Sequence, residues 1–314
     1  MPPVVHAFAA FAEALRPFLE KHFPGREVVC WSRPEDFAAG IADVEYLFVL
    51  HPPRDHWADA GRLRLIHCLG AGVDDLLPAR GLRREVVVSN NRGMSAGPMS
   101  EFGLTLVLAL LKRLPFFLDA QRDATWRRQL PEPVAGRTLG ILGLGAIGLA
   151  LAERAAALGM RVIGTQRSPK SHPAVAHIYP PEQTDAVLAE SDVVVVLLPL
   201  TDETRGTFGG ERFARMRAGS HLVNLARGGI VDEQALIAAL TSGHLASAAF
   251  DVFATEPLPA DSPLWTTPNL WITPHMAGGF PDLLEVSTRE FAENVVRMER
   301  GDPPRSPIDR ERGY

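Results

Sequence analysis

The chain has 314 residues, of which 46% are hydrophobic and 22% are charged. This composition is ordinary for a folded protein and provides enough apolar residues for two hydrophobic cores. The formal net charge is -5, and the Lys and Arg residues are scattered along the chain instead of forming a basic stripe. The composition therefore argues against nucleic acid and anionic membranes as partners, and it favours a small molecule.

The chain has only two cysteines, Cys30 and Cys68, and each lies beside apolar residues in a short predicted strand. This placement is typical of buried thiols in a reducing compartment and predicts neither a disulfide nor a metal site. The first 30 residues do not combine a basic start, an apolar block and a cleavage site, and no apolar run is long enough to span a bilayer. We therefore expect a cytoplasmic protein.

Short apolar runs alternate with helical stretches along the whole chain, which indicates βαβ units and parallel sheets. The run from Val193 to Leu198 contains only valine and leucine, as expected for a strand that helices cover on both faces. In chain order, the predicted strands are Glu27 to Cys30, Tyr46 to Leu50, Arg64 to Leu69, Val86 to Ser89, Thr138 to Leu142, Arg161 to Thr165, Val193 to Leu198, His221 to Leu225, Ala246 to Val252 and Leu270 to Thr273.

Two breaks interrupt this alternation. After the first, at residues 90–93, a strongly apolar predicted helix has Pro98 in its first turn and continues through Leu114. Between Phe102 and Leu111 it is apolar on nearly every face, so it must be buried in the core or against another subunit. The second break is at residues 278–281. After it, a last predicted helix from Asp282 to Arg300 could return the chain to the first domain.

A glycine motif at residues 143–148, Gly-Leu-Gly-Ala-Ile-Gly, lies between a predicted strand and a predicted helix from Leu149 to Leu158. In this context the first glycine permits a tight turn, the second lets a pyrophosphate approach the backbone, and the third lets helix and strand pack closely. The helix N-terminus presents unpaired N–H groups to the phosphates. The motif predicts a dinucleotide site that includes Gly143, Gly145, Ala146, Ile147 and Gly148.

A second glycine cluster, at residues 69–74, also follows a predicted strand, but Asp75 stands where a third glycine belongs. It is therefore not a second dinucleotide motif. Its backbone N–H groups can still bind a small anion at the carboxyl end of a strand.

The end of the strand after the glycine motif distinguishes the two nicotinamide cofactors. NAD enzymes usually carry Asp or Glu about twenty residues beyond the glycines, whereas an arginine there accommodates the 2′-phosphate of NADP. Here the sequence reads Gln166, Arg167, Ser168, Pro169 and Lys170, without a carboxylate. A guanidinium, a hydroxyl and an ammonium group can hold a dianionic phosphate. The sequence favours NADP over NAD, unless these cations are only solvated loop charges.

Three polar residues follow the nucleotide motif, each at or just beyond a predicted strand: Arg227, Glu256 and His275. Taken singly, each has an ordinary explanation, as a loop charge, a turn residue before proline or a structural histidine. With the glycine motif, their segments 224–229, 251–257 and 273–279 resemble the D-isomer-specific 2-hydroxyacid dehydrogenase family, and the resemblance covers about Leu65 to Phe280. Without a large carboxyl-terminal extension, the chain looks like the glyoxylate and hydroxypyruvate reductases of that family, and its arginine loop is similar to those that prefer NADPH.

The resemblance implies a catalytic set of Arg227, Glu256 and His275, and the reduction of a 2-oxo acid needs the same groups. Arg227 can hold the substrate carboxylate through paired, charge-assisted hydrogen bonds, so that carbon 2 lies near the nicotinamide. Protonated His275 can stabilise the developing oxyanion and deliver the proton. Glu256 beside it is expected to favour the imidazolium and to fix its orientation.

Further contacts are implied by the resemblance alone. The backbone N–H groups of Ala71 and Gly72 are expected to hold the substrate with Arg227 and His275. Asp251 is expected to contact the nicotinamide carboxamide, with a turn or helix cap as the alternative. Met276 and Ala277 stand at positions that vary across the family, and segment 121–133 has no clear match in it. The resemblance therefore does not identify the substrate. The full set of expected cofactor contacts is Gly143, Gly145, Ala146, Ile147, Gly148, Gln166, Arg167, Ser168, Pro199, Thr204, Ala226, Asp251 and Gly278.

The expected fold is α/β, with two doubly wound parallel-sheet domains. A Rossmann dinucleotide-binding domain, residues 98–284, is inserted in a discontinuous, flavodoxin-like substrate-binding domain, residues 1–97 and 285–314. The expected function is reduction of a small 2-oxo acid to a D-2-hydroxy acid by NADPH, in a homodimer. Two alternatives are a redox-sensing protein like the corepressors of the family, which have long tails, and a formate dehydrogenase, which has glutamine where Glu256 stands.

Overall fold

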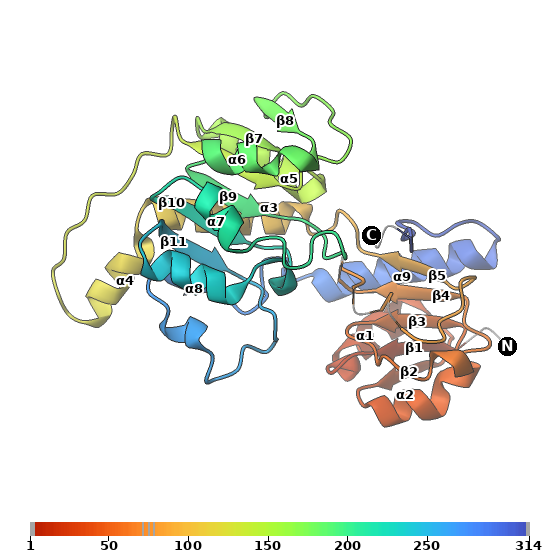
Figure 1. Ribbon diagram of the computed structural model, residues 1–314. Helices are drawn as coiled ribbons and strands as arrows, with labels where there is room; N and C mark the ends of the chain where they lie inside the picture. The colour runs from red at the N-terminus through yellow and green to blue at the C-terminus, as the bar shows by residue number, and fades with distance from the viewer. Residues whose placement is uncertain (1–3, 71, 75, 78, 312–314) are drawn as a thin grey trace. The chain divides into compact units, whose positions relative to one another are not determined.

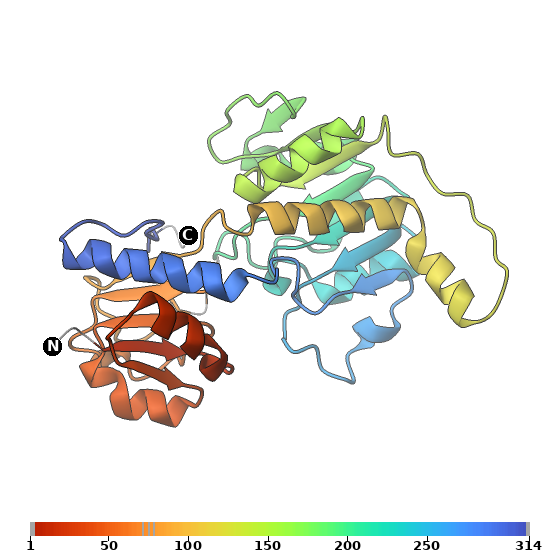
Figure 2. The same ribbon diagram turned by 180° about the vertical axis from the view of Figure 1, so that it is seen from behind.

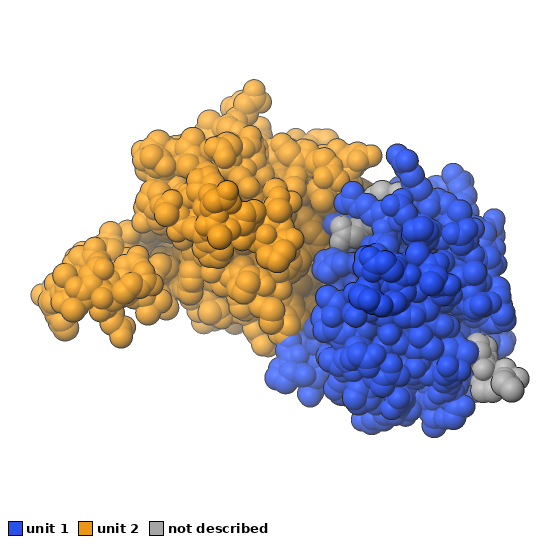
Figure 3. Space-filling model, turned by 90° about the horizontal axis from the view of Figure 1, so that it is seen from below, with its two compact units in different colours: residues 1–94, 280–314 blue, residues 95–279 orange. Residues whose placement is uncertain are grey.

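The computed structural model describes residues 4–70, 72–74, 76, 77 and 79–311. The chain forms two compact units, residues 1–94 with 280–314 and residues 95–279 (Figure 3). In each unit parallel strands alternate with helices, so the predicted α/β class with two parallel sheets is confirmed. No helix within the described residues is both long and apolar enough to cross a bilayer.

The first unit contains a five-stranded parallel sheet in the order β2-β1-β3-β4-β5 (Figure 1). This is the strand order of flavodoxin-like sheets. β3 shows how the sheet is buried on both faces, because Tyr46 and Phe48 face one core and Leu47 and Val49 face the other. The strands are β1 (Val5–Phe8), β2 (Val28–Trp31), β3 (Tyr46–Val49), β4 (Leu65–Cys68) and β5 (Val87–Asn90).

Helices cover both faces of this sheet. On one face, α1 (Ala12–His22) packs against α9 (Leu283–Glu299), and their buried side chains include Leu15, Leu19 and Phe291. On the other face, Phe37 of α2 (Pro34–Gly40) joins the second core of the unit. The last helix of the chain therefore belongs to the same unit as the first strands.

The second unit contains a seven-stranded parallel sheet in the order β12-β11-β10-β9-β6-β7-β8. Counted outward from β6, this is the doubly wound Rossmann order, and the direction of winding reverses between β6 and β9. Ligands bind such sheets at the carboxyl ends of the strands beside this reversal point. The strands are β6 (Thr138–Leu142), β7 (Arg161–Thr165), β8 (His177–Tyr179), β9 (Val193–Val196), β10 (Ser220–Asn224), β11 (Leu245–Phe250) and β12 (Leu270–Ile272).

Two layers of helices enclose this sheet, and Figure 2 shows one of them. α3 (Ala96–Leu111) and α5 (Ala146–Ala157) pack together over one face. α6 (Thr184–Glu190), α7 (Gly210–Arg215) and α8 (Glu233–Thr241) cover the other face. The continuous valine run of β9 thus lies between two apolar layers, as predicted.

The apolar helix predicted to continue through Leu114 ends earlier. α3 stops at Leu111, Arg113 adopts a left-handed φ of 56°, and a separate helix α4 (Leu114–Arg122) follows. Leu106, Val107, Leu110 and Leu111 of α3 lie in the core of the unit, and Met99, Phe102 and Leu104 pack against it, which explains the apolar character of the helix.

The two cysteines are free thiols. Cys68 is fully buried, as predicted, and burial raises its pKa to about 12. Cys30 is only half-buried, because its strand β2 lies at the edge of the sheet; burial still raises its pKa to about 11.

Candidate active site

The glycine turn joins β6 to α5 at the reversal point of the second sheet. Gly143 has a φ of 105°, and a Cβ there would lie 2.8 Å from the carbonyl oxygen of Leu197. Gly148 packs so closely on the turn that a Cβ would overlap the carbonyl oxygen of Gly143. A Cβ on Gly145 would meet no atom within 4 Å, so the backbone there borders open space. The three glycines thus have the steric properties that the motif requires.

The first turn of α5 fits the pyrophosphate of a dinucleotide. No side chain caps the helix at Gly145. The N–H groups of Ala146, Ile147 and Gly148 belong to the helical turn that has no intrahelical acceptors, and they can serve an anion. Together with the open space at Gly145, this geometry leaves room for a phosphate beside the donors.

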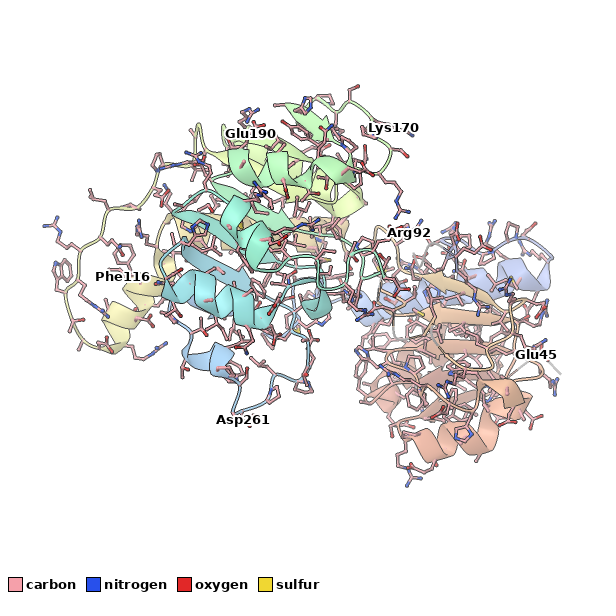
Figure 4. The ribbon with its side chains drawn as sticks, viewed as in Figure 1. Glu45, Arg92, Phe116, Lys170, Glu190 and Asp261 are labelled. Carbon is pink, nitrogen blue, oxygen red and sulfur yellow. The ribbon has the colours of Figure 1, made fainter. Side chains whose placement is uncertain are left out.

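The loop after β7 carries the residues expected to select the cofactor, and Figure 4 labels Lys170 on it. Arg167, Ser168 and Lys170 are exposed, whereas Gln166 is half-buried. Nη2 of Arg167 lies 3.5 Å from Oε2 of Glu203, a carboxylate that the sequence did not indicate. Glu203 comes from the segment after β9, so only the fold brings it to this loop. Arg167 thus lies beside the exposed carboxylate of Glu203.

Pro199 and Thr204, two expected cofactor positions, lie in the same segment after β9. The hydroxyl of Thr204 donates a hydrogen bond to the carbonyl oxygen of Pro199, 2.6 Å away, and accepts one from the N–H of Thr201 at 2.8 Å. These bonds close a turn at the reversal point. Whether either residue contacts the cofactor stays a prediction.

Glu256 and His275 form a direct pair. Nδ1 of His275 donates a hydrogen bond to Oε2 of Glu256, 2.6 Å away. The other oxygen of Glu256 accepts a hydrogen bond from the N–H of Phe253 at 2.8 Å, which fixes the carboxylate. The side chains of His275 and Glu256 are 43% and 32% exposed, so the imidazole ring is accessible to solvent.

Asp251 holds the turn on which His275 lies. Its buried carboxylate accepts hydrogen bonds from the hydroxyl of Thr273 at 2.5 Å, the N–H of Met276 at 3.0 Å and the N–H of Ala277 at 2.8 Å. Its carbonyl oxygen also accepts from the N–H of His275, which has a left-handed φ of 53°. This geometry is the cap that the sequence left as an alternative, whereas contact with the carboxamide stays a prediction.

Arg227 follows β10 and is half-buried. Its Nη1 donates to the carbonyl oxygen of Ala226 at 2.8 Å. The next residue, Gly228, lies against the loop that leads to Glu256: a Cβ there would overlap the backbone of Phe253. Glycine at this position therefore lets the arginine loop and the glutamate loop pack together.

Arg227, Glu256 and His275 follow the neighbouring strands β10, β11 and β12, and so they lie along the carboxyl edge of one parallel sheet. Sequence reasoning placed each of them after a strand, and the strand order brings those strands side by side.

A Cβ at Gly278 would make only ordinary contacts, the nearest 3.5 Å from the hydroxyl of Ser95, so packing does not require glycine there.

The remaining predicted substrate contacts belong to the first unit. Gly72 follows β4, and Ala71 lies outside the described residues. Their contact with a substrate carboxylate stays a prediction.

Within the described residues, no group of His, Cys, Asp and Glu side chains has the arrangement of a metal site.

A doubly wound sheet with a glycine turn at its reversal point and a histidine–carboxylate pair at the same edge defines a dinucleotide-dependent oxidoreductase. Residues 104–277 match the family model of the D-isomer specific 2-hydroxyacid dehydrogenase NAD binding domain. The chain belongs to the D-isomer specific 2-hydroxyacid dehydrogenase family and is an NAD(P)-dependent oxidoreductase.

Similar proteins cover nearly the whole chain. A glyoxylate/hydroxypyruvate reductase A of Serratia proteamaculans is 34% identical over 303 residues, which cover 94% of each chain. A crystal structure of a D-isomer specific 2-hydroxyacid dehydrogenase from Xanthobacter autotrophicus in complex with NADPH and MES is 37% identical, with a TM-score of 0.86 and 99% of each chain covered. An NADPH-dependent glyoxylate/hydroxypyruvate reductase from Sinorhizobium meliloti, with NADP and sulfate, is 30% identical, with a TM-score of 0.89 and both chains fully covered.

Proposed function

We propose that this enzyme uses NADPH to reduce a small 2-oxo acid, of the glyoxylate or hydroxypyruvate class, to a D-2-hydroxy acid. The observation that carries the proposal is the 2.6 Å hydrogen bond between His275 and Glu256, on the sheet edge that also carries Arg227. The names of the reductases from Serratia proteamaculans and Sinorhizobium meliloti support the substrate class.

When bound, the reduced nicotinamide supplies a hydride to carbon 2 of the substrate. Arg227 binds the substrate carboxylate and orients the carbonyl group. Because Nδ1 of His275 donates to Glu256, the opposite nitrogen, Nε2, is the one that faces the carbonyl oxygen. Protonated Nε2 stabilises the negative charge that develops on this oxygen and transfers its proton to it, which completes the alcohol. Glu256 balances the positive charge of the ring before the transfer.

The preference for NADPH rests on the loop after β7. Its residues 166–170 contain no carboxylate, and its cations Arg167 and Lys170 are exposed beside the hydroxyl of Ser168. These groups suit a dianionic 2′-phosphate. A carboxylate at one of these five positions would instead accept hydrogen bonds from the ribose hydroxyls of NAD. Glu203, 3.5 Å from Arg167, belongs to the segment after β9, and its side chain is 81% exposed. The structural neighbours with bound NADPH or NADP agree with this choice.

The test is a panel of 2-oxo acids assayed with NADPH and with NADH, followed by chiral analysis of the products. We expect turnover of glyoxylate and hydroxypyruvate, a lower KM for NADPH than for NADH, and D products from prochiral acids. A lower KM for NADH would overturn the cofactor assignment. Tight NADPH binding without turnover of any acid would instead indicate a redox sensor.

We also propose a homodimer, formed through an arm of the second unit, residues 114–133 (Figures 1 and 2). Phe116 lies on the helix of this arm (Figure 4), and Trp126 and Leu130, farther along, are 94% and 88% exposed. Large apolar side chains that are this exposed indicate a protein surface as their partner.

Light scattering should give the mass of two chains for the wild type and of one chain for a variant that carries both Trp126→Asp and Leu130→Asp. The matched control Phe11→Ser, at an exposed phenylalanine of the first unit, should stay dimeric.

The proposal includes the predicted substrate-binding role of the first domain, with Ala71 and Gly72. It also includes a cytoplasmic location, which agrees with the two free thiols.

A further inference from the structure

The side chain of Gln166 connects two parts of the nucleotide-binding edge. Its Nε2 donates a hydrogen bond to the carbonyl oxygen of Leu144, 2.8 Å away in the glycine turn. Its Oε1 accepts a hydrogen bond from the N–H of Lys170, 3.0 Å away at the far end of the loop after β7. The backbone of Gln166 is also fixed, because its N–H donates to Tyr179 of β8 at 3.0 Å. Both ends of the amide are therefore engaged by backbone groups.

We propose that Gln166 is a positioning residue for the selection of NADPH. Its amide holds Arg167, Ser168 and Lys170 in the shape that receives the 2′-phosphate, at a fixed place relative to the turn that receives the pyrophosphate. The inference rests on the proposed function, since it concerns the phosphate that distinguishes NADPH from NADH.

Only an amide of this length has both groups that the bridge needs. The carbonyl oxygen of Leu144 requires a donor, and the N–H of Lys170 requires an acceptor. Glutamate would turn a carboxylate oxygen toward the carbonyl of Leu144, methionine would offer no strong partner to either group, and asparagine would be one methylene shorter. The two hydrogen bonds therefore require glutamine at position 166, whereas a loop position that contacts only solvent accepts many residue types.

Pro169 has no N–H to donate, and the side chains of Arg167, Ser168 and Lys170 are exposed, so the amide of Gln166 is a backbone anchor of this loop. Without the bond to Gln166, the loop would have to be ordered when the phosphate binds, and this ordering lowers affinity. The cost falls chiefly on NADPH, because NADH has no 2′-phosphate for the loop to hold.

The experiment measures binding and turnover of Gln166→Ala and Gln166→Met. Calorimetric titration with NADP+ and with NAD+ gives the dissociation constants, and steady-state assays give KM and kcat with each reduced cofactor. We expect the dissociation constant of NADP+ and the KM for NADPH to rise about tenfold, because both hydrogen bonds of the amide are lost. The values for NAD+ and NADH should rise less than those for NADP+ and NADPH.

The matched control is Gln183→Ala, an exposed glutamine of the same unit outside the nucleotide-binding edge, which should leave all these constants unchanged. Circular dichroism checks the fold of each variant, and Gln166→Met retains most of the side-chain volume if Gln166→Ala is unstable. An equal loss of affinity for NADP+ and NAD+, or no loss for either, would overturn the inference. A wild-type enzyme that binds NAD+ as tightly as NADP+ would overturn the proposed cofactor preference as well, so the two failures are distinguishable.

Discussion

Nδ1 of His275 lies 2.6 Å from Oε2 of Glu256, and the other oxygen of Glu256 is held by the N–H of Phe253. We expect His275→Ala to lower kcat at least ~100-fold, the usual contribution of a general acid. Glu256→Gln should have a smaller effect, because the amide can still orient the ring but no longer balances its charge. Steady-state assays with glyoxylate and NADPH provide the measurement.

Cofactor binding is the control for this pair. Calorimetry should give the wild-type dissociation constant for NADP+ in both variants, because neither side chain holds the nucleotide. Near-normal turnover of His275→Ala would exclude this histidine as the proton donor.

Arg227 is expected to bind the substrate rather than the cofactor. Arg227→Ala should raise the KM for the 2-oxo acid by about tenfold or more, since a charge-assisted, paired contact is lost. Arg227→Lys should recover only part of this loss, because an ammonium group cannot make both hydrogen bonds in one plane. The KM for NADPH is measured in parallel and should stay unchanged. If the KM for the acid did not rise in either variant, another group would have to bind the carboxylate.

Asp251 accepts three hydrogen bonds from the turn that carries His275. In Asp251→Asn, an NH2 group replaces one of the two carboxylate oxygens. This group then faces an O–H or N–H donor of the turn, with which it cannot form the hydrogen bond. We therefore expect a lower melting temperature and a loss of kcat of about tenfold, as one buried hydrogen bond is broken. Thr273→Val removes one donor only and should act in the same direction with a smaller effect.

The same variants separate two roles of Asp251. If the carboxylate only positions the histidine, the KM for NADPH stays at its wild-type value while kcat falls. A rise of this KM, with kcat unchanged, would instead support the contact with the nicotinamide carboxamide that the family resemblance implied.

His67 makes stability depend on pH in the acid range. It is fully buried between Ser89 and Asn91, and burial lowers its pKa from 6.5 to about 4. Between these values the unfolded chain binds a proton that the folded chain does not, so the free energy of unfolding falls as the pH drops from 6.5 to 4. The expected slope is about 1.4 kcal/mol per pH unit for each such histidine. His6, with its pKa also lowered to about 4 by burial, should add a similar slope.

Urea unfolding at several pH values measures these slopes. His67→Gln retains a group that can hydrogen-bond and removes the titration, so its slope between pH 6.5 and 4 should be smaller than that of the wild type. An unchanged slope in this variant would show that His67 does not contribute to the acid sensitivity.

Most strands could be predicted from the sequence, because each is a short run of β-branched or other apolar residues between turns. Thr138–Leu142 and Arg161–Thr165 match the prediction, and the ends of the other predicted strands differ from it by at most two residues. β1 and β8 were not predicted. Val5–Phe8 contains the polar His6, and His177–Tyr179 has Ile178 as its single aliphatic residue. Such strands are stabilised by pairing with a neighbour, which a local pattern does not contain.

The glycine turn and the types of the residues proposed for catalysis were determined by the sequence itself, since each depends on a few consecutive residues beside a strand. The strand order decided that Arg227, Glu256 and His275 share one edge. Tertiary structure alone showed that Asp251 holds the turn of His275, that Glu203 lies beside Arg167, and that Gln166 joins the loop after β7 to the glycine turn. These contacts join residues far apart in the chain, and hydrogen bonds between such residues depend on distances and directions that only packing sets.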